Sequence, residues 1–198
     1  FITWVLVRTL YRVRVDGLKH VPDEGAALVV CNHVSFMDPL ILMANVRRPM
    51  RFVMYYKIYN LPILRFVFRT AKAIPIAGRN EDPALMERAF ELVDEALANG
   101  EVVCIFPEGG ITRDGTIQNF RPGVDRILAR RPVPVVPMAL RGMWGSIFSR
   151  RDSALRRARL PRRFWSRIEL VGGAPLPAGD ADAAVLEARV TELRGDNP

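Results

Sequence analysis

Short apolar runs and amphipathic stretches alternate along the 198-residue chain. The apolar runs have the length of buried strands. They predict strands over residues 26–31, 51–54, 73–76, 101–106, 133–140 and 167–171, with a further alternating segment over 11–15. A period near 3.6 predicts helices over residues 1–12, 39–45, 83–99 and 182–193, and a short helix after Pro122. Strands interleaved with helices predict a single layered α/β domain with a mostly parallel central sheet flanked by helices.

Capping residues mark the start of two of these helices. Asp82 followed by Pro83 opens the longest one, and Gly100 ends it. Asp38 followed by Pro39 has the same form, which predicts that Asp38 is the N-cap of the shorter helix that follows it.

The charge of the chain narrows the kinds of partner. The formal net charge is +8, and the excess cations are arginines. A basic chain of ordinary globular composition, with 49% hydrophobic residues, is expected to meet a nucleic acid, an acidic membrane surface or a phosphorylated small molecule. One cationic zone, residues 150–167 with Phe164 and Trp165, is predicted to be an irregular insertion that serves a membrane or an acidic carrier protein.

Two segments are predicted to touch a membrane. No stretch reaches the roughly 18 apolar residues of a membrane span, but residues 1–7 suit the tail of an upstream span or an interfacial helix. Within residues 55–72, cations recur at helical spacing beside aromatic side chains, which is typical of helices that lie on anionic membranes. The alternative is an ordinary amphipathic helix packed on the sheet. The predicted membrane contacts here are Arg65, Phe66, Phe68, Arg69 and Lys72.

Cys31 and Cys104 each end an apolar run. We therefore interpret both as buried strand thiols in a reducing compartment, in preference to a disulfide or a metal pair.

The chain has only two histidines, His20 and His33. His33 directly follows a predicted strand and precedes a predicted helix, and functional groups of open α/β sheets gather at this edge. The turn between them can fold Asp38 onto the imidazole and leave the other ring nitrogen as a general base. Backbone N–H groups at the start of the helix are candidate oxyanion donors. The alternative is that Asp38 serves only as a helix cap.

A second motif follows the strand that ends near residue 106. Its Pro107 and glycines shape a loop whose backbone N–H groups suit an anion, Glu108 is placed to orient a polar acceptor, and Arg113 is placed to hold a phosphate. The alternative is a glycine-rich turn with an exposed glutamate.

Three blocks together carry a family resemblance. His33 with Asp38, then Phe106 to Gly109, then residues 133–137 resemble the glycerolipid acyltransferases typified by 1-acylglycerol-3-phosphate O-acyltransferases, in the same order over roughly residues 13–145. The resemblance implies an acyltransferase domain over 19–198, preceded over 1–18 by a membrane-adjacent helix and lead-in, in a fragment of a longer chain.

The resemblance also implies a role for each motif residue. In the family the histidine is the general base, the aspartate positions it, the Phe-Pro-Glu-Gly block binds the acceptor and the Val-Pro block lines the site. These roles fall on His33 and Asp38 as the catalytic pair, on Arg79, Glu108, Gly109 and Arg113 for acceptor or phosphate binding, and on Pro107 and Pro137 as lining residues.

Two departures from the family pattern fall on the acceptor side. The Ile-Asp-Arg of the family's second block is replaced here by Ile76-Ala77-Gly78-Arg79, and the arginine of the third block comes two residues later, at Arg113. The sequence after Gly109 looks like the branch that acylates lysophospholipids, which is often fused to a transporter-like membrane domain.

The resemblance predicts transfer of a fatty acyl group from acyl-CoA or acyl carrier protein to a lysophospholipid hydroxyl. It implies no cofactor and no metal, with the bilayer as a partner, at the cytoplasmic face of a membrane. The alternative acceptor is 1-acylglycerol-3-phosphate. A basic nucleic-acid-binding module is a competing hypothesis, but no DNA-binding or RNA-binding motif is present. An inactive membrane-binding module is a third, against which the intact pair of His33 and Asp38 argues.

Overall fold

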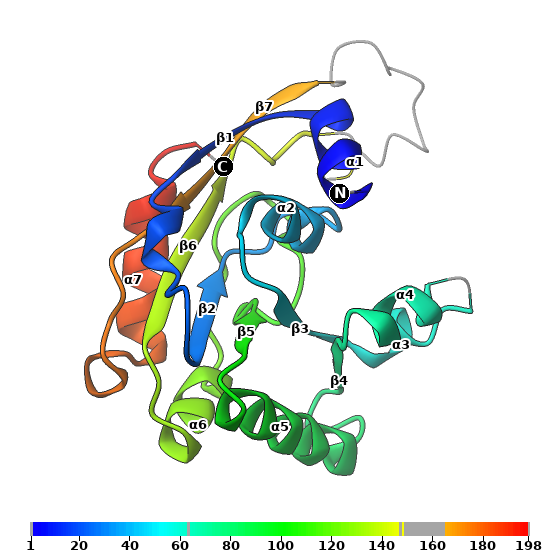
Figure 1. Ribbon diagram of the computed structural model, residues 1–198, viewed down its shortest axis with the longest axis vertical. Coiled ribbons are helices and arrows are strands. Elements are labelled where there is room, and N and C mark those ends of the chain that lie inside the picture. The colour runs from blue at the N-terminus through cyan, green and yellow to red at the C-terminus, as the bar shows by residue number, and fades with distance from the viewer. Residues whose placement is uncertain (1, 63, 147, 149–164, 198) are drawn as a thin grey trace.

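The computed structural model describes residues 2–62, 64–146, 148 and 165–197. Seven strands of these residues form one sheet in the order β1-β7-β6-β2-β5-β3-β4 (Figure 1). Every neighbouring pair is parallel except β6 and β7, which confirms the mostly parallel sheet. The strands are β1 Tyr11–Asp16, β2 Ala27–Cys31, β3 Met50–Tyr55, β4 Ile74–Ile76, β5 Val102–Ile105, β6 Val135–Arg141 and β7 Ser166–Gly172.

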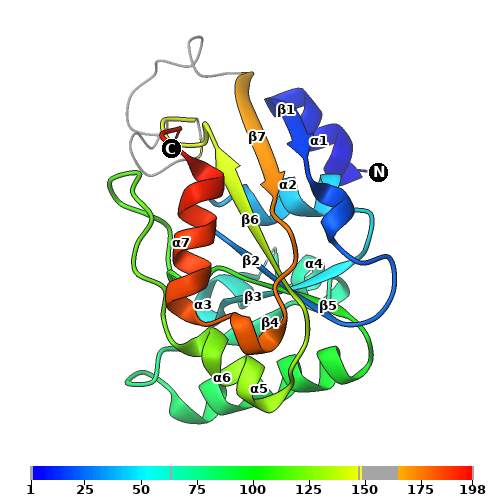
Figure 2. The same ribbon diagram turned by 90° about the vertical axis from the view of Figure 1, so that its left-hand side faces the viewer.

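Helices cover both faces of the sheet, as expected of an α/β domain. One buried cluster joins α1 and α2 to the first face, and a second joins α5, α6 and α7 to the other (Figures 1 and 2). The helices are α1 Ile2–Leu10, α2 Asp38–Asn45, α3 Tyr56–Tyr59, α4 Arg65–Thr70, α5 Pro83–Ala98, α6 Gly123–Arg130 and α7 Ala183–Arg194.

Helix α5 begins and ends where its sequence signals predicted. The Asp82 side chain accepts from the backbone N–H of Leu85 at 2.9 Å, and the residue after the helix C-cap, Gly100, has φ +74°, which glycine adopts without strain. The same mechanism opens α7, where Asp182 accepts from the N–H of Val185. These two caps are local interactions, so the sequence alone identifies them.

The N-terminal segment is part of the layered fold. Strand β1 forms one edge of the sheet and pairs with β7, while α1 packs on α2 through the buried Val7. The segment up to residue 18, which we expected to be a lead-in to the domain, therefore contributes the edge strand β1 to the sheet and the helix α1 to the layer beside it. None of the helices in the described residues is long and apolar enough to cross a membrane.

The strand order brings the two sequence motifs together. β2 and β5 are neighbours, and Val30 pairs with Ile105. His33 and Glu108 each follow that pair by three residues, and they lie side by side at the carboxyl edge of the sheet. Residues that are 75 positions apart in the chain thus share one site.

Candidate active site

His33 lies in the turn between β2 and α2. Its Nδ1 lies 2.8 Å from Oδ2 of Asp38, and because an ionised carboxylate only accepts, Nδ1 carries the proton of this bond. The imidazole stacks on Phe106, with the ring centroids 4.3 Å apart. In the neutral imidazole with its proton on Nδ1, the lone pair lies on Nε2. The side chain is 18% exposed, so Nε2 of that form is able to take a proton from a bound hydroxyl.

Asp38 is the first residue of α2 and is completely buried. Besides His33, its Oδ2 accepts from the backbone N–H groups of Val34 at 2.7 Å and Ser35 at 2.9 Å. The carboxylate therefore reaches back over the turn that carries His33. These three donors fix the turn and the imidazole together.

This geometry corrects the expectation that Asp38 is the N-cap of α2. Met37 occupies that position and makes no side-chain cap bond. Some of the backbone N–H groups around this helix start are already engaged or missing: those of Val34 and Ser35 bind Asp38, that of Met37 donates to Ser35 Oγ, and Pro39 has none.

Glu108 holds the turn of His33 from the neighbouring strand. Its Oε1 accepts from the backbone N–H of His33 at 2.6 Å, and its Oε2 accepts from the N–H of Gln118 at 2.8 Å. Burial raises the pKa of Glu108, while these two hydrogen bonds act in the opposite direction. Because both oxygens are bonded to backbone and the residue is 5% exposed, Glu108 positions the loop and does not extend toward an acceptor.

The loop after Glu108 is tied to His33 on its other side. The N–H of Thr112 donates to the carbonyl of His33 at 2.9 Å, which keeps the exposed Arg113 on the loop next to the base. Gly109 has φ +70°, and a Cβ there would lie 2.6 Å from Nε of Arg121, so only glycine fits. Pro107 is buried and its carbonyl accepts from the N–H of Arg121.

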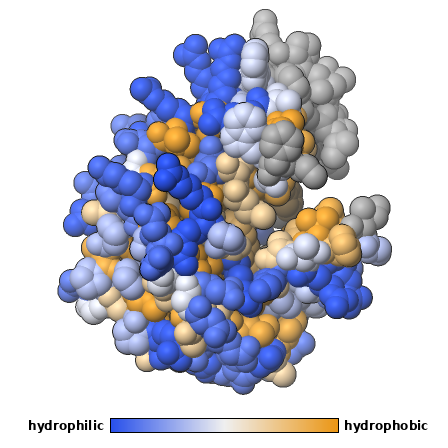
Figure 3. Space-filling model, in the orientation of Figure 1, coloured by the Kyte–Doolittle hydropathy of each residue, from blue (hydrophilic) through white to orange (hydrophobic). Residues whose placement is uncertain are grey.

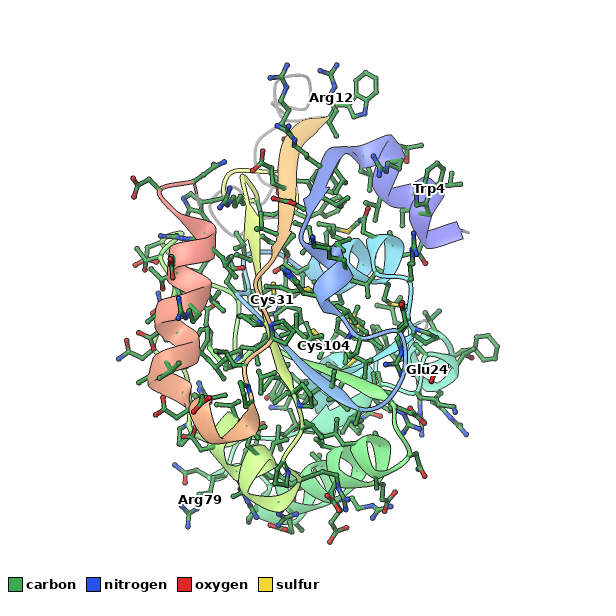
Figure 4. All side chains as sticks on the ribbon, turned by 60° about the vertical axis from the view of Figure 1, so that its left-hand side comes forward. Trp4, Arg12, Glu24, Cys31, Arg79 and Cys104 are labelled. Atoms are coloured by element: carbon green, nitrogen blue, oxygen red, sulfur yellow. The ribbon has the colours of Figure 1, made fainter. Side chains whose placement is uncertain are left out.

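Two residues expected at the site lie elsewhere. Arg79 lines a groove with Glu87 and Arg126 on the side of α5 and α6, and Figure 4 shows it far from Cys31, two positions before His33. Pro137 is buried in β6 and faces Gly173 on the side of α7. Of the residues assigned to acceptor binding and lining, the structure thus brings Glu108, Gly109, Arg113 and Pro107 to His33, and leaves out Arg79 and Pro137.

The predicted basic stripe is divided between one short helix, α4, and the turn that follows it. Arg65 and Arg69 are exposed in α4, whereas Lys72 follows the helix with φ +51° and is not part of its surface. Phe66 is 77% exposed, while Phe68 is half-buried and stacks on Tyr59. Figure 3 shows apolar side chains gathered over α4 at the right-hand edge.

Most of the second cationic zone, residues 150–163 with Phe164, lies outside the described residues. Of its remaining members, Trp165 is exposed and lies under the guanidinium of Arg12, 4.4 Å from the ring centroid. Figure 4 shows Arg12 at the same end of the molecule as Trp4.

Two contributors to the site were missed by the sequence reasoning. Phe106 supports the imidazole by stacking, and its position two residues after the buried Cys104 would have indicated the same face of the strand. Asn32 binds both the N–H and the carbonyl of Leu140 and thereby locks the end of β2 to β6. The contact between Asn32 and Leu140 could not be predicted from the sequence, because it depends on β2 and β6 being neighbours in the sheet.

Both cysteines lie in the core of the sheet and not in the site itself. Cys31 and Cys104 are free and buried, as predicted, and burial raises the pKa of both thiols. Among the described residues, no group of three or more His, Cys, Asp or Glu side chains is placed to hold a metal ion.

A mostly parallel sheet with a histidine–aspartate pair beyond β2 and a Phe-Pro-Glu-Gly turn beyond β5 is the arrangement of a glycerolipid acyltransferase domain. The sequence model of the Acyltransferase family matches residues 12–141, so the chain belongs to this family.

Curated relatives carry a more specific name. A chloroplastic 1-acyl-sn-glycerol-3-phosphate acyltransferase of Arabidopsis thaliana is 27% identical over 139 residues, which cover 70% of this chain and 38% of the relative. A probable 1-acyl-sn-glycerol-3-phosphate acyltransferase of Mycoplasma pneumoniae is 26% identical over 171 residues, covering 83% of this chain and 62% of the relative. The chain therefore spans less than two thirds of the length of these relatives.

A solved structure has the same fold. The 1-acyl-sn-glycerophosphate acyltransferase PlsC of Thermotoga maritima superimposes with a TM-score of 0.70 over 93% of this chain and 70% of that chain, at 22% sequence identity.

Proposed function

We propose that this domain transfers a fatty acyl group from a thioester to the free hydroxyl of 1-acyl-sn-glycerol-3-phosphate, with His33 as general base oriented by Asp38. The observation that carries the proposal is the bond of 2.8 Å between His33 Nδ1 and Asp38 Oδ2, in a chain of the Acyltransferase family. The names of the relatives favour this acceptor over the lysophospholipids that the sequence motifs first indicated.

The residues suit a direct transfer. His33 Nε2 takes the proton of the acceptor hydroxyl while its oxygen attacks the thioester carbonyl carbon. The carbon–sulfur bond then breaks, and the leaving thiolate takes the proton from the imidazolium. General base catalysis of this kind typically contributes about 10² to 10⁴ in rate. A thioester is already activated, so the two buried cysteines need no part in the reaction.

Arg113 is our choice for the acceptor phosphate. It is exposed on the loop that Thr112 ties to His33, and a guanidinium binds phosphate strongly. Arg113→Glu should raise the KM for the phosphate-bearing acceptor by at least about tenfold with less change in the KM for the donor, since hydrogen bonds to charged groups contribute about 1.5–3 kcal/mol. Arg79→Glu is the matched control, because Arg79 lies on the side of α5 and α6. A rise in the donor KM alone would assign Arg113 to the donor's phosphates.

The acceptor is a lipid, so we also propose that the domain works at a membrane surface. Exposed apolar side chains on α1 and around α4 support this proposal, and they include Trp4, Val5, Leu6, Leu61, Leu64, Phe66 and Val67. Arginines in the same helices suit anionic headgroups.

One assay tests the function. The chain is incubated with acyl-CoA or acyl carrier protein, and thiol release is measured without acceptor, with 1-acylglycerol-3-phosphate, and with lysophosphatidylethanolamine. We expect release that depends on 1-acylglycerol-3-phosphate and is lost in His33→Ala. Faster turnover of lysophosphatidylethanolamine would favour the lysophospholipid acceptor. Absence of release with every donor and acceptor would contradict the proposal.

A further inference from the structure

The loop that carries Arg113, residues 109–118, is closed by one of its own side chains, and we call it the Arg113 loop. Thr112 is buried, and its hydroxyl donates to the carbonyl of Thr116 at 2.7 Å and accepts from the N–H of Gly115 at 3.1 Å. A threonine hydroxyl that bonds the backbone on both sides fixes the turn around it. Thr112 therefore lies inside this turn, while Arg113 is exposed on it.

Two side chains from the last third of the chain contact this turn. Gly115 is buried with φ +88°, and a Cβ there would lie 2.8 Å from the indole of Trp144, so the backbone of Gly115 packs directly on that ring. The guanidinium of Arg194, the last residue of α7, donates to the carbonyl of Gly115 at 2.8 Å. Figure 2 shows the loop between β5 and α6 beside α7. The Arg113 loop is thus held at one buried glycine from two directions.

Both of these side chains are anchored to the sheet. Nε of Arg141, the last residue of β6, donates to the carbonyl of Leu193 at 2.6 Å, next to Arg194. Trp144 follows β6 directly after Met143, which is completely buried in the core cluster. The end of β6 and the end of α7 therefore form one fixed support under the Arg113 loop.

The other side of the Arg113 loop is bonded to the residue that we propose as the base. The N–H of Thr112 donates to the carbonyl of His33 at 2.9 Å. Arg113 thus lies between a neighbour bonded to His33 and a glycine bonded to Arg194. Because the backbone is held on both sides of Arg113, its main chain has a set position relative to the imidazole.

We propose that Arg194 and Trp144 are positioning residues for the acceptor, which hold the Arg113 loop in place beside His33 so that Arg113 meets the acceptor phosphate. The inference rests on the proposed function, in which Arg113 binds that phosphate. A loop that is held before the acceptor arrives binds without the cost of ordering it, and a loop that is released must be ordered each time. Loss of the support should therefore weaken acceptor binding more than it slows the chemical step.

The proposal gives the C-terminal helix a part in substrate recognition. Neither Arg194 nor Trp144 belongs to the motifs around His33 and Glu108, and both lie beyond residues 12–141, which the family model matches. The two positions therefore connect α7 to the loop that the motif after β5 begins.

A double-mutant cycle tests the coupling. Arg194→Ala should raise the KM for 1-acylglycerol-3-phosphate by about three- to tenfold, the effect of one lost hydrogen bond from a charged group, with little change in kcat or in the KM for the donor. In the background of Arg113→Ala the same change should have little further effect on the acceptor KM, because the residue that it positions is already gone. The same loss factor in both backgrounds, or an unchanged acceptor KM, would overturn the inference.

Matched variants separate positioning from general damage to α7. Arg189→Ala removes another arginine of this helix, which is exposed and pairs with Glu192, and it should be silent. Trp144→Ala should raise the acceptor KM in the same way as Arg194→Ala, and Trp144→Phe, which keeps a flat ring under Gly115, should recover most of the loss. An equal rise in Arg189→Ala would overturn the role of Arg194.

A measurement without substrate separates this inference from the proposed function. Amide hydrogen exchange followed by mass spectrometry reports how firmly the Arg113 loop is held. In Arg194→Ala, peptides over residues 109–118 should exchange faster by at least about fivefold, while peptides over β2 and β5 keep their rates, and Arg189→Ala should match the wild-type chain. Unchanged exchange of the loop would overturn the role of Arg194 whether or not the chain transfers acyl groups. Faster exchange in a wild-type background that is inactive with this acceptor would overturn only the proposed function.

Discussion

At the scale of single residues, two carboxylates with different tasks hold the turn that carries His33. Asp38 binds the imidazole and two backbone N–H groups of the turn, while Glu108 reaches from the next strand and binds the backbone of His33. Each carboxylate is buried, so its bonds are formed inside the protein, where they are stronger than in water. Substitution of Asp38 should therefore lower mainly the catalytic rate, and substitution of Glu108 should lower the free energy of unfolding as well.

The first prediction concerns the base. His33→Ala should lower kcat by at least about 10² while the protein stays folded. His20 lies outside the site, where its Nδ1 is 3.0 Å from the carbonyl of Gly172, so His20→Ala should keep full specific activity. Steady-state rates and circular dichroism of both variants check this. Equal losses in the two variants would show that His33 is not the base.

The second prediction concerns the charge of Asp38. Asp38→Asn keeps the shape of the side chain and removes the charge that stabilises an imidazolium, so activity should fall by at least about 10². Asp182→Asn is the matched control, because Asp182 only caps α7 and asparagine caps about as well. Melting curves and rates of both variants are compared. An active Asp38→Asn enzyme would mean that the carboxylate has only a structural role.

The third prediction concerns Glu108, which accepts through both oxygens. In Glu108→Gln the amide NH₂ must face one of the two donors, so the free energy of unfolding should fall by about 1–3 kcal/mol, and activity should fall with it. Glu187→Gln is the control, since within the described residues Glu187 accepts from the N–H of Phe120 and its amide can turn to keep that bond. Urea denaturation of both variants measures the difference. Equal free energies of unfolding in Glu108→Gln and Glu187→Gln would contradict the role of Glu108 in holding the His33 turn to the loop of Gln118.

At the scale of elements, α4 differs from every longer helix in what it buries. Its apolar residues Phe66 and Val67 are exposed, and no residue of α4 is buried. By contrast, α5 buries a full apolar stripe against the sheet. A helix with exposed aromatic and cationic side chains is suited to the surface of an anionic bilayer.

The fourth prediction tests this surface. Arg65→Glu and Arg69→Glu together, with Phe66→Ser, should weaken binding to anionic liposomes by at least about tenfold, because each cation near such a surface contributes roughly 1 kcal/mol. The loss should be smaller at high salt. Arg88→Glu on the exposed face of α5 is the control. Liposome sedimentation measures the binding, and unchanged sedimentation of the triple variant would leave α4 as an ordinary surface helix.

At the scale of the whole molecule, the two neighbouring central strands β2 and β5 each carry a buried thiol near their carboxyl end, Cys31 and Cys104. Figure 4 shows both cysteines inside the molecule. Their reactivity therefore reports whether the centre of the sheet has opened.

The fifth prediction follows from that position. The thiolate is the reactive form, and burial raises the thiol pKa of both cysteines above the ordinary value. Neither should react with iodoacetamide at pH 8 in the folded protein, and both should react fully in urea. Mass spectrometry after timed labelling measures this. Rapid labelling of the native chain would show that the core opens easily.

Local signals in the sequence determined much of the fold. Apolar runs predicted the strands β2, β3, β4, β5, β6 and β7 within a few residues. For β2, β5 and β6 the reason is burial on both faces, which requires continuous apolar sequence. Asp82 and Gly100 identified the ends of α5, since a cap binds within its own helix turn. The spacing of His33 and Asp38 allowed a closed turn but left a simple helix cap open, and the second motif with the family resemblance led to the predicted contact that the structure shows.

The roles of the other site residues depended on contacts between distant parts of the chain. The pairing of β2 with β5 directs Glu108 onto the backbone of His33, and no periodicity along either strand encodes which strands become neighbours. The same long-range order places Arg79 in one groove with Glu87 and buries Tyr11 in the cluster that also contains Ile41 of α2. The sequence by itself determined most of the elements and predicted the contact between His33 and Asp38. Only the tertiary structure decided which groups support that pair, because strand order and register arise from packing of the whole sheet.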